Sequence, residues 1–213
     1  MKTRWLRHFL LGFVGALVIA FGLSIFTATT AATRFYYSIT DLGTLGGSES
    51  YALSMNDMGQ IVGTSQTSSG DTQAFLWQGG VMTDIGAAAG YNNSTARDIN
   101  NLSQVIGDAG TVNVSFFSSF LWSNGTITTS HVPDWCIAKD LNDAEQIIGL
   151  CTIQGTAYAS AFLFQGGQFI DNFDPLNFPT EALDINNNGR IVGYGTVNGE
   201  NHAFVLTPTW VTR

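Results

Sequence analysis

Three aspartates are the residues of this sequence whose type and spacing could do chemistry together. Asp98, Asp140 and Asp184 each precede an asparagine by two positions, and they follow one another at intervals of 42 and 44 residues. If a repeat gathered them near a common axis, carboxylates within about 10 Å could hydrolyse a glycosidic bond. The same residues could instead bond to their own turns and cap strand ends. The sequence leaves both interpretations open.

The sequence offers no complete site for a metal or a cofactor. Residues 184–189 are similar to the start of a calcium loop, but residues 191–193 are apolar where a late carboxylate is needed. His131 and His202 are isolated and lack the spacing of a metal-binding pair. No Gly-x-Ser-x-Gly elbow anchors a hydrolase triad. We therefore expect no catalytic, cofactor-binding or metal-binding residue here, and a non-enzymatic role is favoured.

Cys136 and Cys151 are the only cysteines, and an even number in an exported chain permits one disulfide. If Leu141 pairs with Gln146 across a four-residue loop, the same register places Cys136 opposite Cys151. We expect a structural disulfide, whereas a register shifted by one would leave two buried thiols. The equivalent pairs elsewhere in the chain consist of small residues: Ser50 with Ser65, Ser94 with Ala109, and Thr180 with Gly195.

A block of about 44 residues, present four times, must position all these side chains. The Asn56 position recurs after 44, 42 and 44 residues (100−56, 142−100 and 186−142). Periods near this length are typical of supersecondary units that stack or surround an axis. Four segments align without a gap: Ala52–Gly63, Ala96–Gly107, Ala138–Gly149 and Ala182–Gly193.

Each copy has the pattern of four short strands. The first strand ends at an Asp-x-Asn step, an Asn/Asp/Gly turn follows, and the second strand has the form Gln-Ile-Val-Gly. A third strand has an aromatic core residue (Phe75, Phe120, Phe162 or Phe204), and a glycine turn leads to a fourth strand such as 81–85. Four antiparallel strands in this length predict the blade of a β-propeller.

The chain ends suggest how the repeat closes. The fourth copy runs into residues 207–210 without a fourth strand, and residues 36–43 are similar to residues 81–86. We therefore predict an all-β fold, a small β-propeller of four units that is closed by pairing of the N-terminal strand 36–42 with the last unit. Open stacking of the units, or two chains that complete one larger ring, are the alternatives.

The N-terminus has the pattern of a secretory signal. Lys2, Arg4 and Arg7 precede an apolar run over 9–26, and small residues follow. We expect a signal peptide at 1–32 or, alternatively, an uncleaved membrane anchor, and a single β-repeat domain at 33–213. Either interpretation predicts a secreted or extracytoplasmic protein, in the periplasm or at the cell surface, with membrane contact only through this segment.

Charge excludes one class of partner. Without its first 32 residues the chain keeps five basic and sixteen acidic residues, a net charge of about −11 (5−16). A surface this acidic repels the phosphate backbone, because nucleic-acid binding depends on Lys and Arg. We expect no nucleic-acid partner.

Three separated elements, in the same order, carry a resemblance to a known family. They are His202-Ala203-Phe204 in the third strand, the recurring Ile-Asn-x-x-Gly-x-Ile-Val-Gly element, and residues 40–47 (Thr-Asp-Leu-Gly-Thr-Leu-Gly-Gly). Over residues 36–206 the chain resembles the HAF-repeat family of exported proteins. The resemblance implies an extracytoplasmic repeat protein and implies no activity. The sequence departs from the family pattern at the histidine, which Gln73, Ser118 and Ser160 replace in the other copies.

These observations predict an exported, non-enzymatic β-repeat module with a binding or structural role at the cell envelope or outside the cell. The alternative is a carbohydrate-active or other hydrolytic enzyme that uses carboxylates near the propeller axis. The ligand, a glycan or a peptide, would be read by variable loops at 87–95, 113–118 and 175–180. Trp77, Trp122 and Tyr91 could form a ligand-reading rim, because exposed aromatic rings stack on sugars and peptides. Packing between blades is the other role open to Trp77 and Trp122.

Overall fold

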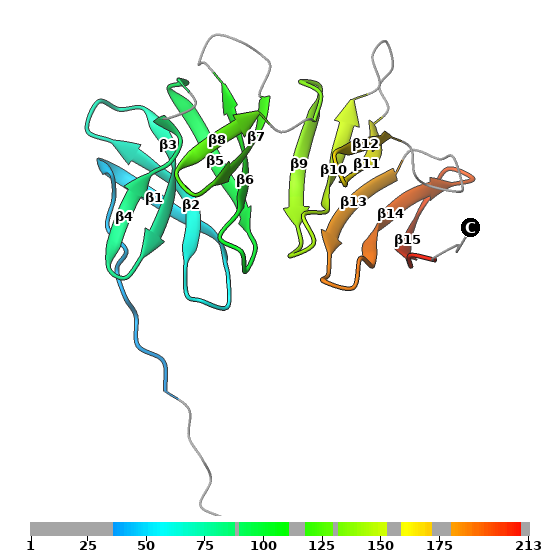
Figure 1. The fold of residues 1–213 in the computed structure, drawn as a ribbon, viewed down its shortest axis with the longest axis horizontal. Helices are drawn as coiled ribbons and strands as arrows, with labels where there is room; N and C mark the ends of the chain where they lie inside the picture. Colours follow the sequence, from blue (N-terminus) through cyan, green and yellow to red (C-terminus); the bar gives the residue numbers. More distant parts are fainter. Residues whose placement is uncertain are drawn as a thin grey trace, which may run out of the picture. The chain divides into compact units, whose positions relative to one another are not determined.

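The computed structural model describes residues 36–87, 90–110, 118–129, 132–152, 159–171 and 180–209. The predicted signal or anchor at 1–32 lies outside these residues. The chain divides into two compact units, Met1–Thr40 and Asp41–Arg213, and the second contains all the strands in Figure 1. Within the described ranges, no helix has the length and apolar character needed to span a membrane.

The strands follow the predicted repeat of four, and we call the successive groups blades 1 to 4. Blade 1 contains β1 (Gly46–Met55), β2 (Ile61–Thr67), β3 (Thr72–Gln78) and β4 (Val81–Asp84). Blade 2 contains β5 (Asn93–Ile99), β6 (Val105–Gly110), β7 (Ser118–Ser123) and β8 (Thr126–Thr129). Blade 3 contains β9 (Cys136–Leu141), β10 (Ile147–Thr152), β11 (Ala159–Gln165) and β12 (Gln168–Asp171), and blade 4 contains β13 (Thr180–Ile185), β14 (Ile191–Val197) and β15 (Glu200–Leu206).

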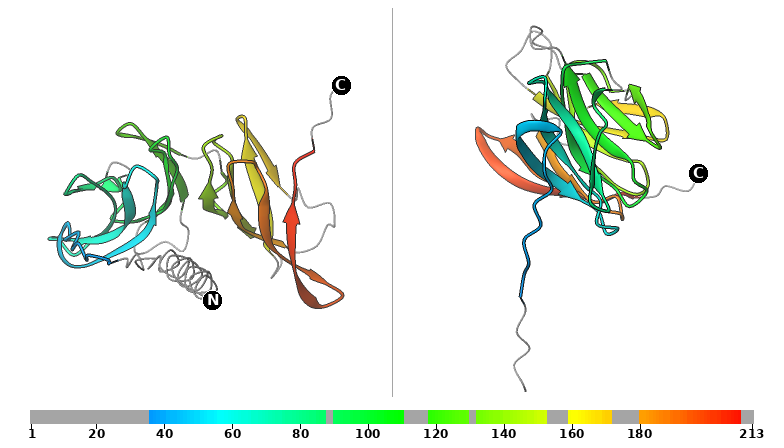
Figure 2. Two further views of the ribbon diagram at one scale, coloured as in Figure 1. Left: turned by 90° about the horizontal axis from the view of Figure 1, so that it is seen from below. Right: turned by 90° about the vertical axis from the view of Figure 1, so that its left-hand side faces the viewer.

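Within each blade, sequential strands pair antiparallel, as expected for strands joined by short turns. Blades 3 and 4 repeat the pattern. Blades 1 and 2 are also joined by a single parallel pairing between Thr72 and Asn93. Figure 2 shows β13–β15 (orange to red) beside the yellow-green strands of blade 3. The sequence-based prediction of an all-β repeat protein is confirmed.

The recurring glycine of the second strand faces the first strand at close range. A Cβ atom on Gly63, Gly107, Gly149 or Gly193 would lie 1.9, 2.2, 2.0 or 2.0 Å from a backbone carbonyl oxygen of the first strand. In all four blades the first strand has a register irregularity beside this glycine, next to Ala52, Ala96, Ala138 or Ala182. Only glycine lets the two backbones approach this closely.

The hydrophobic core lies between consecutive blades. Val62 of blade 1 packs with Ala96 and Ile99 of blade 2, and Ile106 of blade 2 packs with Ala138 and Leu141 of blade 3. Ile148, Ala182 and Ile185 form the matching group between blades 3 and 4. Each blade therefore buries its apolar faces against its neighbours, as repeat proteins do.

The predicted closure of the ring is wrong for this structure. Residues 36–42 form no strand, and β15 pairs only with β14, so blade 4 has three strands in the described part of the chain. The segment that follows bonds to blade 1 instead: Gly43 accepts a hydrogen bond from Ser50 Oγ (2.7 Å), and the Leu45 amide donates to Ser65 Oγ (2.9 Å). Such bonds hold residues 43–45 without any strand pairing to the last blade.

Candidate functional site

An asparagine at the end of each first strand organises the turn that follows it. In blade 2, Oδ1 of Asn100 accepts hydrogen bonds from the amides of Leu102 (3.0 Å) and Gln104 (2.9 Å). The equivalent Asn56, Asn142 and Asn186 make the same pair of bonds. These are Asx turns, and the sequence analysis considered that role for the aspartates two positions earlier.

The same four asparagines connect the blades, and we call them the asparagine ladder. Nδ2 of Asn56 donates to the Asn100 carbonyl (3.0 Å), Nδ2 of Asn100 to the Asn142 carbonyl (3.1 Å), and Nδ2 of Asn142 to the Asn186 carbonyl (3.0 Å). Asn56, Asn100 and Asn142 are buried. Each amide therefore satisfies its own turn and the next blade at once.

The next residue of each turn forms a second row, in which aspartate and asparagine alternate. The amides of Asp57, Asn101 and Asp143 donate to a side-chain oxygen of Asn101 (2.9 Å), Asp143 (2.8 Å) and Asn187 (2.8 Å). Side-chain Nδ2 groups of Asn101 and Asn187 donate back to Asp57 (3.0 Å) and Asp143 (2.9 Å). Alternation gives every carboxylate an amide donor beside it, so the negative charges are compensated by hydrogen bonds.

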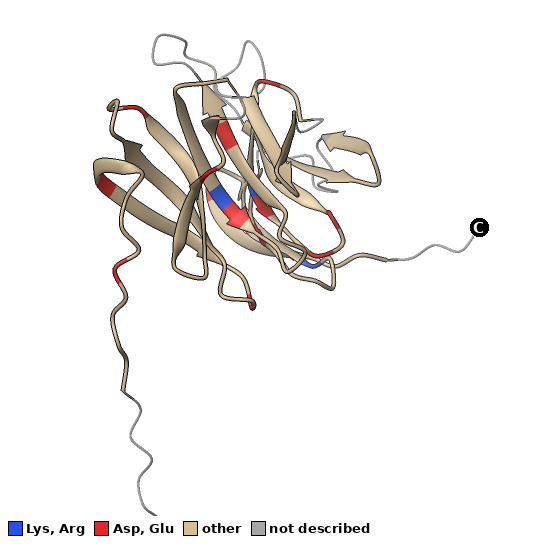
Figure 3. Ribbon diagram, turned by 60° about the vertical axis from the view of Figure 1, so that its left-hand side comes forward, with Lys and Arg blue, Asp and Glu red and all other residues tan. Residues whose placement is uncertain are grey.

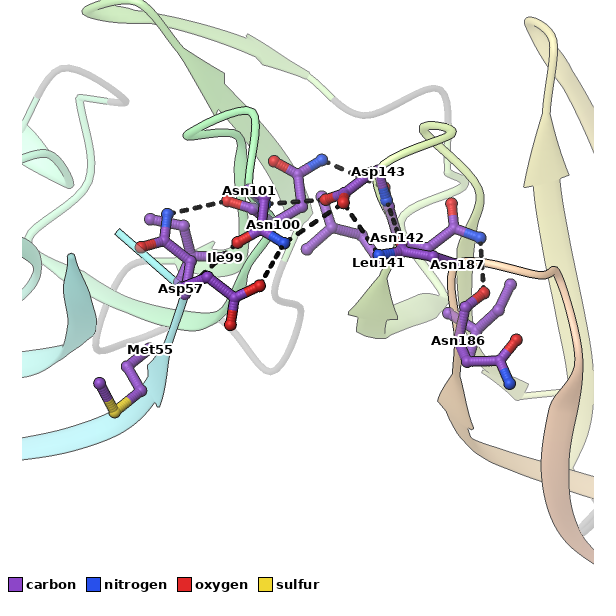
Figure 4. Close-up of a pocket in the computed structure, with 12 residues that line it drawn as sticks. Met55, Asp57, Ile99, Asn100, Asn101, Leu141, Asn142, Asp143, Asn186 and Asn187 are labelled. Atoms are coloured by element: carbon purple, nitrogen blue, oxygen red, sulfur yellow. Dashed lines mark hydrogen bonds between the residues drawn. The ribbon is translucent and has the colours of Figure 1, made fainter. Parts of the chain in front are cut away.

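These turns surround a pocket of about 280 Å³, which we call the turn pocket. Figure 4 shows the side chains of Asp57, Asn101 and Asp143 in it, with Met55 at one end. Met55 is 65% exposed and no hydrogen bond ties its side chain, so it is the adaptable part of the wall. Carboxylate and amide groups dominate the rest of the lining, which suits a polar ligand with hydroxyl or amide groups.

The three aspartates of the sequence analysis, which we call the aspartate row, do come together. Asp140 hydrogen-bonds the side chains of Asp98 and Asp184. Burial and these two carboxylates raise the pKa of Asp140 to about 9, so it carries the shared proton at neutral pH. Asp98 accepts the amide of Leu141 (3.2 Å). Asp140 accepts the amide of Ile185 (2.6 Å), so the row holds consecutive blades together. None of the three lines the turn pocket.

The two basic residues on strands in the described ranges, Arg97 and Lys139, lie beside acidic ones, as Figure 3 shows. Arg97 pairs with Asp108, whose pKa burial raises even though the guanidinium opposes the shift. Lys139 of blade 3 pairs with Glu181 of blade 4, and this hydrogen bond lowers the pKa of Glu181. Two of the few cations are therefore used in ion pairs within the fold.

The disulfide between Cys136 and Cys151 is confirmed, and the two residues face each other in β9 and β10. The three equivalent small pairs also face each other as predicted. The register at the turn was wrong by one, because Leu141 pairs with Ile147 and not with Gln146. A register shift between Ile148 and Gly149 restores the predicted pairing before it reaches the cysteines.

The aromatic residues proposed as a rim are partly buried. Trp122 and Tyr91 pack against the core between blades 1 and 2, and Trp77 pairs with Ile61 and Met82. Their reading of a ligand stays a prediction. Of the proposed loops, residues 88–89, 113–117 and 175–179 lie outside the described residues, as does His131. His202 is exposed and lies 3.9 Å from Glu200.

Within the ranges that the structure describes, no group of three or more His, Cys, Asp and Glu side chains could hold a metal ion. The sequence analysis missed the turn pocket and the asparagine ladder. One sequence feature could have revealed them: asparagine is present at all four equivalent positions, Asn56, Asn100, Asn142 and Asn186. A turn alone would also accept Asp or Ser there, so the recurrence of asparagine indicates a further role for its side-chain amide.

Comparison with known proteins identifies the fold. No family model matches the sequence, and no curated protein matches it. A similar solved structure is the β-propeller domain of the Trilobed protease from Pyrococcus furiosus, described as having an open velcro topology. The TM-score is 0.51 at 10% sequence identity, over 70% of this chain and 50% of the other. The chain thus spans half the length of that structure, and the likeness establishes a β-propeller-like fold.

Proposed function

We propose that this chain is an exported, non-enzymatic β-repeat protein that binds a ligand at the cell envelope or outside the cell. The observation that carries the proposal is the turn pocket, to which all four blades contribute the same three positions. A pocket built from repeated turns can hold a ligand without any blade supplying a special residue. Binding sites of repeat proteins are commonly surfaces of this kind, shared by several units.

The chemistry of the lining favours a glycan or a peptide. Asp57 and Asp143 supply carboxylate acceptors, while Asn101 and Asn187 supply amides that both donate and accept. Met55 adds an apolar contact beside them. Hydroxyl and amide groups fit such a lining, whereas an anionic ligand would face two carboxylates. The volume of about 280 Å³ is at the small end for ligand pockets, which indicates a single sugar ring or one side chain.

The aspartate row supports a binding role over the hydrolytic alternative. Glycosidases hold their two carboxyl groups about 5 to 9.5 Å apart, so that the substrate or a water fits between them. Asp140 instead hydrogen-bonds Asp98 and Asp184 directly, which leaves no such space. Backbone amides of the following blade occupy further oxygens of Asp98 and Asp140. We therefore assign these acids to the joining of blades.

Three observations support export. The Cys136–Cys151 disulfide is the kind of bond that persists in oxidising compartments outside the cytoplasm. The resemblance to HAF-repeat proteins and the signal pattern at 1–32 agree with it, and both remain proposals.

A glycan and peptide array probed with the full-length protein tests the function. We expect binding that Met55→Arg abolishes, because the new side chain would fill the turn pocket. Met58→Arg is the matched control, since Met58 is similarly exposed (57%) but does not line the pocket. Binding that is indifferent to Met55→Arg would contradict the site. Glycan cleavage that is lost in Asp140→Asn would contradict the non-enzymatic role.

A further inference from the structure

Blade 4 presents an uncovered face that the other blades bury. Val62, Ile106 and Ile148 occupy one position of blades 1 to 3, and each is 0% exposed because the next blade covers it. The equivalent Val192 of blade 4 is 41% exposed. Val205, on the neighbouring strand β15, is 51% exposed. Blade 4 therefore keeps the apolar composition of an interface that nothing in the described chain covers.

Blade 1 presents the opposite face uncovered. Ala96, Ala138 and Ala182 of blades 2 to 4 are 0% exposed against the preceding blade, whereas the equivalent Ala52 is exposed. Met55 is exposed where the other blades have a buried isoleucine or leucine. The two uncovered faces are thus the two halves of an interface that occurs three times within the chain.

Hydrogen-bonding groups at the two ends are complementary as well. In the described part of the chain, Nδ2 of Asn186 has no following blade to donate to. The backbone carbonyls of Asn100, Asn142 and Asn186 each accept a hydrogen bond from the preceding blade, whereas the carbonyl of Asn56 has no preceding blade in this part of the chain. The Asp–Asn alternation also ends on Asn187 and begins on Asp57, so a junction between the ends would continue it.

At one pair of positions that face each other across a junction of blades, the uncovered faces of blades 4 and 1 have more apolar residues than the junction of blades 3 and 4. Between blades 3 and 4 the pair is Lys139 with Glu181, which form an ion pair. The corresponding residues for a junction of blade 4 with blade 1 are Leu183 and Tyr51, which are 46% and 58% exposed. An exposed leucine and an exposed tyrosine at matching positions are suited to cover each other.

The N-terminal residues fit the same junction. Oδ1 of Asp41 accepts the Gly43 amide (3.0 Å), as Oδ1 of Asp84 accepts the Gly86 amide (2.9 Å) at the end of β4. Asp41 therefore corresponds to Asp84, the last residue of the fourth strand of blade 1. Blade 4 has no fourth strand within the described residues. Residues 38–41, which precede blade 1, could therefore pair with the β15 edge of a blade 4 that lies next to blade 1, in the register of β4 on β3.

We propose that a second copy of this chain provides the missing neighbour, so that two chains form one closed ring of eight blades. Blade 4 of each chain covers blade 1 of the other, and each chain gives its residues 38–41 to the β15 edge of its partner. Eight blades lie within the usual range of about four to eight. In Figure 4 the labelled residues that line the turn pocket run from Met55 to Asn186, and these two residues do not meet, which favours a second chain over closure of one chain on itself.

The mass of the full-length protein, measured by native mass spectrometry after release from mild detergent, tests this proposal. We expect two chains per particle, in equilibrium with single chains on dilution. Leu183→Glu should weaken association at least about tenfold, because it buries a carboxylate against the ring of Tyr51, whose hydroxyl already donates to the carboxylate of Glu49. Leu102→Glu is the matched control, because Leu102 is similarly exposed (55%) but belongs to a turn of blade 2, and it should associate like the parent. Tyr51→Glu combined with Leu183→Lys should restore the association, by analogy with Lys139 and Glu181.

A particle of one chain at every concentration would overturn the proposal and would indicate closure within a chain or an open array. So would association that Leu183→Glu leaves unchanged, or that Leu102→Glu weakens equally, since either result would locate the contact elsewhere. Particles of three or more chains would also overturn it. The circular dichroism of Leu183→Glu should match the parent, which shows that the change acts on association and not on folding.

Discussion

Replacement of Asn100 by alanine tests whether the asparagine ladder holds consecutive blades together. The side chain is 4% exposed and makes four hydrogen bonds. Nδ2 donates to Oε1 of Gln104 (2.7 Å) and to the Asn142 carbonyl (3.1 Å). Oδ1 accepts the amides of Leu102 (3.0 Å) and Gln104 (2.9 Å). Alanine removes all four bonds at a site that water reaches poorly.

Each such bond stabilises a protein by about 1 kcal/mol, and a buried group left without a partner costs about 1–3 kcal/mol. We therefore expect Asn100→Ala to lower the free energy of unfolding by about 4 kcal/mol. Asn186→Ala is the control, because Asn186 makes the same turn bonds (3.0 and 3.1 Å) but is exposed and donates to no following blade in the described chain. Its loss should be about 1 kcal/mol, since water replaces the turn bonds.

Urea unfolding followed by tryptophan fluorescence measures both variants, because the chain has five tryptophans. Asn100→Asp separates the two roles of the side chain, since it keeps the oxygen that organises the turn and loses the two donated bonds. We expect it to be destabilised at neutral pH and partly restored in acid, where a protonated carboxyl can donate again. Both variants are measured at a dilution at which the chains are single, because only then does Asn186 lack a following blade. Equal losses for Asn100→Ala and Asn186→Ala under this condition would refute the inter-blade role of the ladder.

Three further predictions follow from the fold. Gly107→Ala should lower stability by about 3 kcal/mol, because its Cβ would lie 2.2 Å from the Thr95 carbonyl oxygen, and an unchanged melting temperature would contradict this. The pKa of Asp140 is raised to about 9 in the fold, so protonated Asp140 stabilises the folded state. This contribution to the free energy of unfolding is complete below about pH 4 and is lost as the pH rises through 9. Screening at this partly exposed residue should limit the loss to about 2 kcal/mol between pH 5 and 9. Asp140→Asn should flatten that pH profile in chemical denaturation, and an unaltered slope would show that another group is responsible. Reduction of the Cys136–Cys151 disulfide, whose residues are 15 apart, should cost about 3 kcal/mol in the same assay, and replacement of both cysteines by alanine should remove the sensitivity to reductant.

The fold was predictable to the extent that it repeats. Recurrence of Ala-x-Asp-x-Asn and Gln-Ile-Val-Gly located the strands and placed Cys136 opposite Cys151, because side-chain alternation and turn residues are local signals. The register beside Leu141 was not predictable in this way. A bulge adds one residue to one strand, and the recurring glycine beside it does not show by itself which residue of the first strand is the extra one.

Closure and the site were harder to predict, because both depend on how one blade is placed on the next. Residues 36–42 form no strand, although the Gly43 amide donates to Asp41 as the Gly86 amide donates to Asp84 at the end of β4. Whether this segment pairs with a β15 strand depends on the placement of whole blades, which the sequence of one repeat does not contain. The aspartate row was recognised by its spacing, but its bonds to the amides of the following blade required coordinates.

The direction of the asparagine ladder has a consequence for the history of the chain. Blades 1 to 3 each give a side-chain amide forward, and blades 2 to 4 each accept it on a carbonyl, so the bonding requirements are the same at each internal junction. An in-frame duplication or deletion of two consecutive repeats would keep these bonds and also the alternation of aspartate and asparagine in the second row. Proteins built in this way can change their number of units two at a time by recombination.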